Sequence, residues 1–280
     1  MDELRSDLAE AWRDKDPFSV AKSIRGEVFR EREGRRTLRF EINKKSYFLK
    51  YHSGIGWPEI IKNLTQVKLP VLTAIAEVEA VRALQRVGID TLSIAGYGKR
   101  GINPAKLESF IVTDDLSGTI SLEDLAINWN DIAPSFGFKK SLIKRVADIS
   151  GIMHSAGVNH RDFYLCHFLI NADDAERECA GGPLYLIDLH RAQIRGKVPR
   201  RWLIKDLAGL YFSAADVGLS RSDIFRFIGA YSEFFPSKTI RRNSDFWMAV
   251  RKEAERLYLR HYGIQPTWPL QQPPEPGDDA

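Results

Sequence analysis

Residues 26–52, GEVFREREGRRTLRFEINKKSYFLKYH, contain three short segments in which apolar and polar residues alternate. A period of two residues is typical of β-strands with one buried face. Gly34 and the turn residues 43–45 separate the segments, so the stretch predicts an antiparallel meander. We place its strands at residues 26–31, 35–42 and 46–52.

Beyond this meander the apolar pattern changes from strands to helices. Helices are expected at 57–68 and 73–87, and two further strands at 92–97 and 109–113. After Ser117 and Gly118 the spacing predicts helices at 122–129, 139–155, 202–212, 222–234 and 246–262, interrupted by short apolar strands in 166–170 and 184–189. Strands followed by helices indicate an α+β protein with a small sheet lobe before a helical lobe. We expect the lobes to span residues 1–116 and 117–264, with a disordered Pro-rich tail at 265–280.

Composition narrows the class of protein. The chain has 280 residues, of which 44% are hydrophobic and 28% charged, as in soluble globular enzymes. Its two cysteines provide no disulfide framework and suit a reducing compartment. We find no signal-peptide pattern and no apolar run approaching the roughly 18 to 20 residues that cross a bilayer. A cytoplasmic location is therefore expected.

The net charge of +4 is unevenly distributed. Residues 191–201, RAQIRGKVPRR, contain no acid and include Arg191, Arg195, Lys197, Arg200 and Arg201. Such a run is a candidate surface for binding anions, although a solvated basic face would have the same sequence.

Two aspartates follow predicted helix or strand ends. Asp162 comes after the helix that ends near Gly157, in the sequence HRD, and a second short strand leads to Asp188. Carboxylates on loops held between rigid elements are well placed for chemistry, so both could face one cleft. The alternatives are that Asp162 merely caps or pairs with Arg161 and that Asp188 is a strand-end turn residue.

Lys50 lies on the third predicted strand, on the same face as Phe48. A lysine on an inward face needs an anionic partner, which phosphate oxygens would supply. The alternative is an exposed strand lysine.

With these features in place, the chain resembles the lipopolysaccharide core heptose(I) kinases of the RfaP/WaaP family from about Asp16 to Tyr258. The stretches that carry the likeness are GEVFRE, EGRRTLRFE, SYFLK, EIIKNL, LPVL, VNHRDFYLCHFL, IDLHRAQ, VPRRW and DLAGLYFS. The resemblance implies a bilobal protein-kinase-like fold, with a small antiparallel-sheet N-lobe and a larger, mainly helical C-lobe.

The resemblance also implies roles for individual residues. Asp162 would accept or orient the proton of the attacking sugar hydroxyl, and Asp188 would bind the Mg²⁺ that bridges phosphate oxygens. Lys50 would hold the ATP phosphates and pair with Glu77, for which Glu79 is a nearby competitor. Asp206 would brace the HRD backbone, and His154 would be structural.

The chain departs from the broad kinase pattern at several positions. No G-x-G-x-x-G loop precedes the strand lysine, and Arg35 and Arg36 are expected to neutralise phosphate charge in its place. Phe48 stands where kinases usually carry a small residue under adenine, which predicts an unusual base pocket. His167 replaces the asparagine that holds a second metal ion, so the site would use one Mg²⁺, accept Mn²⁺ or act through water. A buried, hydrogen-bonded histidine is the alternative.

The predicted function is ATP-dependent phosphorylation of the first heptose of the lipopolysaccharide inner core. The resemblance places the enzyme peripherally at the cytoplasmic face of the inner membrane, with the acceptor near Arg191, Arg195, Arg200 and Arg201, and allows acyl carrier protein as a partner. Alternatives are a Ser/Thr/Tyr protein kinase, a Kdo kinase of the same fold and a non-catalytic binding module. A nucleic-acid binder is disfavoured, because no recognition motif accompanies the charge.

Overall fold

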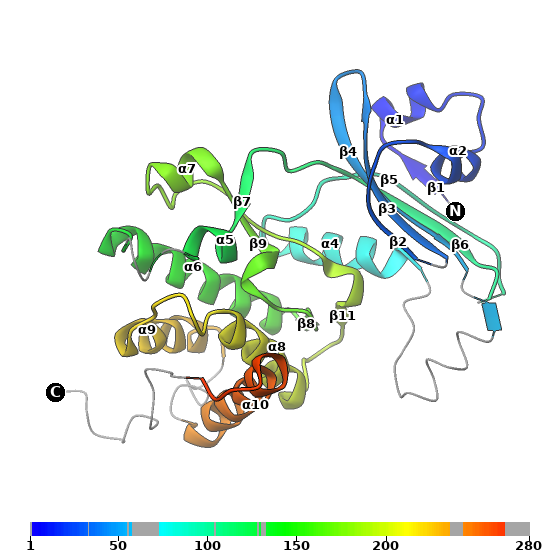
Figure 1. Ribbon diagram of the computed structural model, residues 1–280. Coiled ribbons are helices and arrows are strands. Elements are labelled where there is room, and N and C mark those ends of the chain that lie inside the picture. Colours follow the sequence, from blue (N-terminus) through cyan, green and yellow to red (C-terminus); the bar gives the residue numbers. More distant parts are fainter. Residues whose placement is uncertain are drawn as a thin grey trace. The chain divides into compact units, whose positions relative to one another are not determined.

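The computed structural model describes residues 2–32, 34–54, 56–57, 73–103, 105–127, 129, 133–235 and 243–266. The chain divides into two compact units, the first formed by Met1–Arg82 and Leu92–Ser117, the second by Ala83–Thr91 and Gly118–Ala280 (Figure 1). The change at Ser117 adjoins the predicted boundary, whereas Ala83–Thr91 is grouped with the second unit. Most of the predicted helix at 57–68 and most of the predicted tail lie outside the described residues.

The first unit is built on a six-stranded antiparallel sheet in the order β1-β5-β6-β4-β3-β2. Its strands are β1 (Asp2–Leu4), β2 (Glu27–Arg32), β3 (Arg35–Ile42), β4 (Lys45–Ser53), β5 (Ile94–Arg100) and β6 (Glu108–Asp114). The meander β2-β3-β4 confirms the interpretation of the alternating segments. Asn43 and Lys44, both with positive φ, form the two-residue turn between β3 and β4, a geometry whose twist matches that of the strands.

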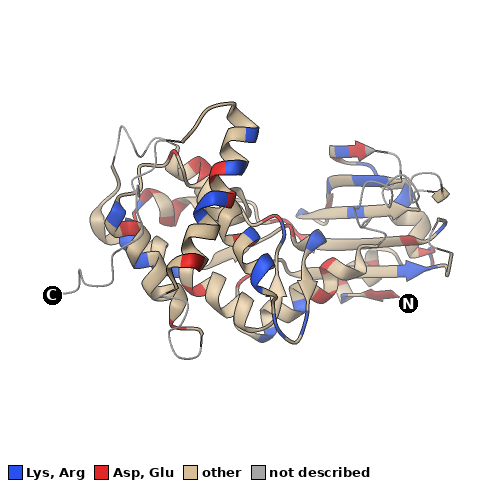
Figure 2. Cartoon of the chain, turned by 90° about the horizontal axis from the view of Figure 1, so that it is seen from below, with Lys and Arg blue, Asp and Glu red and all other residues tan. Residues whose placement is uncertain are grey.

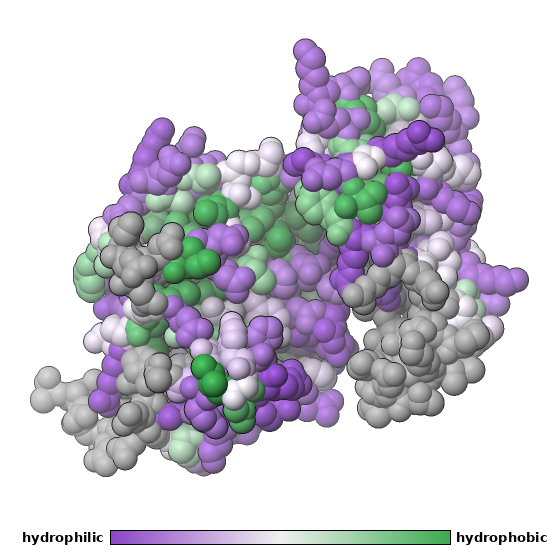
Figure 3. All heavy atoms as spheres, in the orientation of Figure 1, coloured by the Kyte–Doolittle hydropathy of each residue, from purple (hydrophilic) through white to green (hydrophobic). Residues whose placement is uncertain are grey.

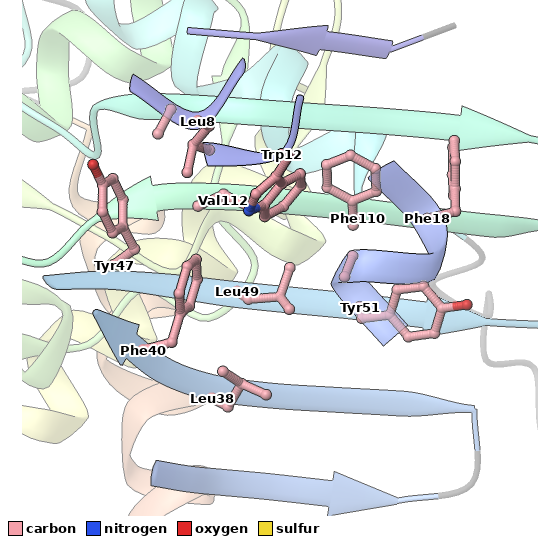
Figure 4. Close-up of a cluster of buried hydrophobic side chains, with 12 residues drawn as sticks. Leu8, Trp12, Phe18, Leu38, Phe40, Tyr47, Leu49, Tyr51, Phe110 and Val112 are labelled. Atoms are coloured by element: carbon pink, nitrogen blue, oxygen red, sulfur yellow. The ribbon is translucent and has the colours of Figure 1, made fainter. Parts of the chain in front are cut away.

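One face of this sheet carries the apolar core of the first unit. Figure 4 shows Leu8, Trp12 and Phe18, from α1 (Ser6–Ala11), α2 (Pro17–Ser23) and the turn between them, packed over the strands. Leu49, on β4, is fully buried in this cluster. Side chains alternate along a strand, so Lys50 belongs to the opposite face. There Ala74 and Val78 of the segment leading into and forming α4 (Ile75–Arg86) pack against β5 and β6.

The second unit is mainly helical. Its helices are α5 (Leu122–Ala126), α6 (Phe136–Ser155), α7 (Ala172–Glu176), α8 (Arg200–Ser213), α9 (Arg221–Ser232) and α10 (Ser244–Tyr262). The short strands β7 (Thr119–Ser121), β8 (Val158–Asn159), β9 (Phe168–Asn171), β10 (Leu184–Leu186) and β11 (Gln193–Ile194) form two small sheets, β10-β9-β7 and β11-β8. The predicted α+β class, with a sheet lobe followed by a mainly helical lobe, is confirmed, although α1 and α2 precede the meander and were not predicted.

Several predicted boundaries were wrong, among them two in the second unit. The helix expected to reach residue 129 ends at Ala126, and the strand expected from residue 166 begins at Phe168. The residues before that strand, Leu165–His167, form a 3₁₀ turn. It is fixed by the Leu165 backbone N–H, which donates to the Ser213 hydroxyl 48 positions away, a contact that local sequence does not reveal.

Close helix packing in the second unit depends on Gly151 of α6. A Cβ added there would lie 2.2 Å from Cδ2 of Phe234, just after α9. Aromatic side chains, Tyr231, Phe246 and Tyr258, then fill the core between α8, α9 and α10. Among the described residues, no helix combines the length and apolar character needed to cross a membrane.

Candidate active site

In the first unit, the structure brings Lys50 and Glu77 together. The Lys50 Nζ lies 2.7 Å from Glu77 Oε1, and only 2% of the Glu77 side chain is exposed. Glu79, the competing candidate, is exposed on α4. The helical spacing of α4 thus turns Glu77 towards the sheet and Glu79 away from it. A buried carboxylate fixes the ammonium group of Lys50 in one position on β4.

The three other predicted nucleotide-binding residues lie on two faces of the sheet. Thr37 is directly opposite Lys50, so Arg35 shares the face of Lys50 and Arg36 lies on the other. The Arg36 Nη1 donates to the carbonyl oxygens of Ile24 at 3.1 Å and Lys22 at 3.4 Å. The expectation that Arg36 joins Lys50 in binding phosphate was therefore wrong.

The side chains of Arg35 and Phe48 lie on the same face of the sheet as Lys50. Burial, and then the charge of Arg30, lower the pKa of the Arg35 guanidinium, which is the environment in which a bound anion is most favourable. The Phe48 ring lies 5.2 Å from the ring of Phe29 on β2. It therefore forms an aromatic surface near the edge of the sheet.

In the second unit, Asp206 holds the loop that carries Asp162. Its carboxylate is 1% exposed and accepts the backbone N–H of His160 at 2.7 Å and that of Arg161 at 2.9 Å. His154 Nε2 lies 3.3 Å from the same carboxylate, and its Nδ1 lies 3.0 Å from the Tyr231 hydroxyl. The bracing role of Asp206 and the structural role of His154 are both confirmed.

The Asp162 carboxylate is positioned by its neighbours. Arg191 Nη1 donates to Asp162 Oδ1 at 2.7 Å, and His167 Nδ1 lies 2.7 Å from the Asp162 carbonyl oxygen. Arg161, immediately before it, has a left-handed backbone with φ of 74°. The alternative in which Asp162 pairs with Arg161 is wrong, because the side chain that binds the Asp162 carboxylate is Arg191.

The structure also brings Asp188 to His167. Asp188 Oδ2 lies 3.6 Å from His167 Nε2, while Oδ1 lies 2.8 Å from His190 Nδ1. Asp188 has a left-handed backbone with φ of 60°. Sequence reasoning assigned no role to His190, although its position two residues after Asp188 could have suggested this contact.

His160 contacts both His167 and the strand that leads to Asp188. It is fully buried, its Nε2 lies 2.9 Å from the Ile187 carbonyl, and its ring stacks on that of His167 with centroids 5.5 Å apart. Burial lowers the pKa of His160. The neutral imidazole therefore donates to the strand that leads to Asp188 and links the two aspartate-bearing segments.

A divalent cation would have one carboxylate donor here. Among the described residues, no three His, Cys, Asp or Glu side chains are grouped closely enough to hold a metal ion by themselves. Asp188 supplies the hard oxygen that Mg²⁺ prefers, and the nearby His167 nitrogen is better suited to Mn²⁺. The site fits a cation whose remaining ligands are phosphate oxygens and water.

The predicted basic residues have different surroundings. Acidic and basic residues are interspersed along the helices in Figure 2, whereas residues 191–201 contain no acid. Arg191 binds Asp162, and Arg195 donates to Asn159 Oδ1. Arg201 lies over the Trp202 ring, but Arg200 lies over the ring of Phe246 instead.

An apolar cavity of about 160 Å³ lies among helices α5, α6, α8, α9 and α10. Leu142, Val146 and Leu210 contribute to its wall, and its lining also includes the charged residues Asp223 and Arg251. Apolar side chains also gather, in green, on the face of the second unit around α5 and α6 in Figure 3. Sequence reasoning missed this cavity, because the apolar face of a helix looks the same whether the space beside it is filled or open.

Comparison with known proteins adds independent information. The Lipopolysaccharide kinase (Kdo/WaaP) family matches residues 20–231. The chain is 48% identical over 260 residues to the lipopolysaccharide core heptose(I) kinase WaaP of Escherichia coli strain K12, covering 93% of this chain and 98% of the relative. It is 44% identical over 257 residues to the protein of the same name from Pseudomonas aeruginosa strain PAO1, covering 92% and 96%.

A solved structure, "WaaP in complex with acyl carrier protein", has the same fold. It superposes with a TM-score of 0.76 at 39% identity, covering 92% of this chain and 99% of that chain. The likeness extends over nearly the whole of both chains and confirms the predicted fold class.

Proposed function

Because the chain belongs to the lipopolysaccharide kinase (Kdo/WaaP) family, we propose that this phosphotransferase moves the γ-phosphoryl group of ATP to the first heptose of the lipopolysaccharide inner core. Relatives that are 44–51% identical and named heptose(I) kinase support heptose over Kdo as the acceptor. The observation that carries the proposal is the Asp162 carboxylate, presented by a loop whose amides Asp206 holds.

In the proposed reaction, Asp162 orients the sugar hydroxyl and takes its proton as the hydroxyl oxygen bonds to the γ-phosphorus. The bond between that phosphorus and the β,γ-bridging oxygen breaks, and ADP leaves. Arg191 occupies Asp162 Oδ1, so Oδ2 is the oxygen that would face the hydroxyl. The Arg191 guanidinium, held beside this carboxylate, can screen the negative charge that gathers on the transferring group.

Lys50, fixed by Glu77, would bind ATP phosphate oxygens from the first unit, and Arg35 on the same face would add a second positive charge. Asp188 would hold Mg²⁺, with Mn²⁺ as the alternative, and His167 would bind it directly or through water. The cation would neutralise charge on the triphosphate. His190 keeps Asp188 oriented by binding its other oxygen.

We propose that the enzyme works peripherally at the cytoplasmic face of the inner membrane, where a lipid-anchored acceptor would lie. The basic run at residues 191–201 would favour peripheral contact with an anionic surface there. The same run carries the residues that we assign to acceptor binding.

The test is to incubate the purified protein with ATP and dephosphorylated core lipopolysaccharide and to locate added phosphate by mass spectrometry. We expect phosphate on the first heptose, and its loss in Asp162→Asn. Asp173→Asn, which changes an exposed acid on α7, is the matched control and should retain activity. Phosphate on Kdo, or on a peptide acceptor instead, would refute the heptose assignment.

We also propose acyl carrier protein as a partner. That protein carries acyl chains, and the apolar cavity of the second unit has the lining that such a chain requires. Val146→Phe would fill part of the cavity. We expect co-purification of acylated carrier protein with the parent chain and its loss with Val146→Phe, while ATP binding persists; equal co-purification would contradict this use of the cavity.

A further inference from the structure

Four cationic side chains surround the ring of Trp202 on α8. Charged atoms of Arg161, Arg195, Arg201 and Lys205 lie 5.0, 5.9, 5.3 and 5.1 Å from its centroid. We call these five residues the tryptophan cluster. An indole ring attracts cations to its faces, but it cannot neutralise four charges that repel one another. The cluster has the composition of a site for an anion.

Hydrogen-bond donors at the cluster lack acceptors. Trp202 Nε1, Arg161 Nε and Asn159 Nδ2 are buried, and none has a hydrogen-bond partner among the described residues. Asn159 is 0% exposed and binds the cluster through its Oδ1, which accepts from Arg195. Buried donors are nearly always paired in folded proteins. A ligand rich in acceptor oxygens would pair them.

Electrostatics at Arg161 favour the same kind of ligand. Burial lowers the pKa of the Arg161 guanidinium, and the charges of Arg191 and Arg195 lower it further. The attraction of Asp162 acts in the opposite direction. An anion between these arginines would replace repulsion with charge-assisted hydrogen bonds.

The cluster adjoins the carboxylate assigned to proton transfer. Arg161 directly precedes Asp162, and Asp206 holds the backbone N–H of Arg161. Arg191, which perturbs Arg161, also binds Asp162. A ligand at the cluster would therefore bind next to the loop that carries Asp162, as a neighbouring part of the same acceptor would.

We propose that the tryptophan cluster binds an acidic sugar of the acceptor, through carboxylate or phosphate oxygens, and thereby places the hydroxyl of the adjoining sugar at Asp162. This inference rests on the proposed function and names the recognition element within its acceptor. A flat membrane surface would meet the exposed Arg201 and Lys205, whereas a compact acidic sugar can also approach the partly buried Arg161 and Arg195.

Binding measured by calorimetry tests the inference without catalysis. The probes are a Kdo disaccharide, mannose 6-phosphate and neutral methyl mannoside. We expect the parent protein to bind at least one acidic probe about tenfold or more tightly than the neutral one, equivalent to about 1.4 kcal/mol. The two acidic probes distinguish a carboxylate from a phosphate as the recognised group.

The decisive variant is Arg201→Gln/Lys205→Gln, which removes two exposed charges four residues apart on α8. Its matched control is Lys140→Gln/Lys144→Gln, two exposed charges with the same spacing on α6. The preference for the acidic probe should fall about tenfold in the first variant and change less than about twofold in the control. An equal loss in both would show general attraction and overturn the inference, as would equal binding of acidic and neutral probes.

Kinetics separate this inference from the proposed function. With core lipopolysaccharide as acceptor, Arg201→Gln/Lys205→Gln should raise KM for the acceptor about tenfold and leave KM for ATP unchanged. Probe binding without any phosphate transfer to heptose would refute the function and leave the anionic site standing. Transfer to heptose with no rise in acceptor KM would refute the site alone.

Discussion

Asp206 offers the sharpest test of how the site is held. Asp206→Asn keeps the side-chain shape but replaces one oxygen with an NH₂ group. The parent carboxylate accepts two backbone N–H groups, from His160 and Arg161, and contacts His154. In the variant, the new side-chain NH₂ group must face one of these N–H donors, and the residue is only 1% exposed, so water cannot readily pair the two groups.

The magnitude follows from the bonds that are lost. A hydrogen bond to a charged group contributes about 1.5–3 kcal/mol, and an unpaired buried donor adds a desolvation penalty. We therefore expect unfolding free energy, measured with denaturant, to fall by about 3 kcal/mol. At roughly 2–4 °C per kcal/mol for a protein of this size class, Tm should fall by about 6–12 °C.

Activity should fall for a reason separate from stability. Asp162 lies one residue beyond the second clamped amide, and misplacing a catalytic group by about 1 Å can cost about 100-fold in rate. When both proteins are assayed well below their melting temperatures, Asp206→Asn should have a kcat about 10- to 100-fold lower than the parent and an unchanged KM for ATP. Unchanged stability and kcat in Asp206→Asn would refute the clamp, and Asp173→Asn serves as the surface control.

Two further predictions concern packing and thiol chemistry. Gly151→Ala should reduce the free energy of unfolding, measured by denaturant titration, by about 1–3 kcal/mol, because its Cβ would meet Phe234. The control is Gly137→Ala on the same helix, whose Cβ would meet nothing within 4 Å and which should be neutral or slightly stabilising. Burial raises the pKa of Cys166 to about 11, so at pH 8 iodoacetamide should label the exposed Cys179 first by mass spectrometry, and faster labelling of Cys166 would contradict its environment.

The face on which each side chain of the meander lies depends on the length of the turn, and the error about Arg36 shows how. The sequence predicted a three-residue turn at 43–45, a register that would place Arg36 on the face of Lys50. In the structure the turn has two residues, Asn43 and Lys44, so Thr37 pairs with Lys50. Because faces alternate along a strand, this register places Arg36 on the other face of the sheet.

Other features could not be predicted, because they arise from contacts that are distant in the chain. The tryptophan cluster needs Arg161 beside Trp202, about 40 positions later in the chain. No local pattern specifies that distance or the unpaired donors that result. By contrast, local sequence identified both aspartates. The HRD motif indicated Asp162, and the predicted strand before Asp188 indicated that residue.

The two aspartate-bearing segments share a feature that helps to explain why their surroundings are so polar. Arg161 and Asp188 both adopt a left-handed backbone, which is unfavourable for residues other than glycine. At Arg161 the carboxylate of Asp206 binds the strained amide itself, and at Asp188 the side chain of His190 binds the carboxylate. Each strained turn is therefore held by a specific polar contact, and removing that contact should release the turn before it disturbs the surrounding core. This is why we expect kcat to respond more strongly than ATP affinity when Asp206 is changed.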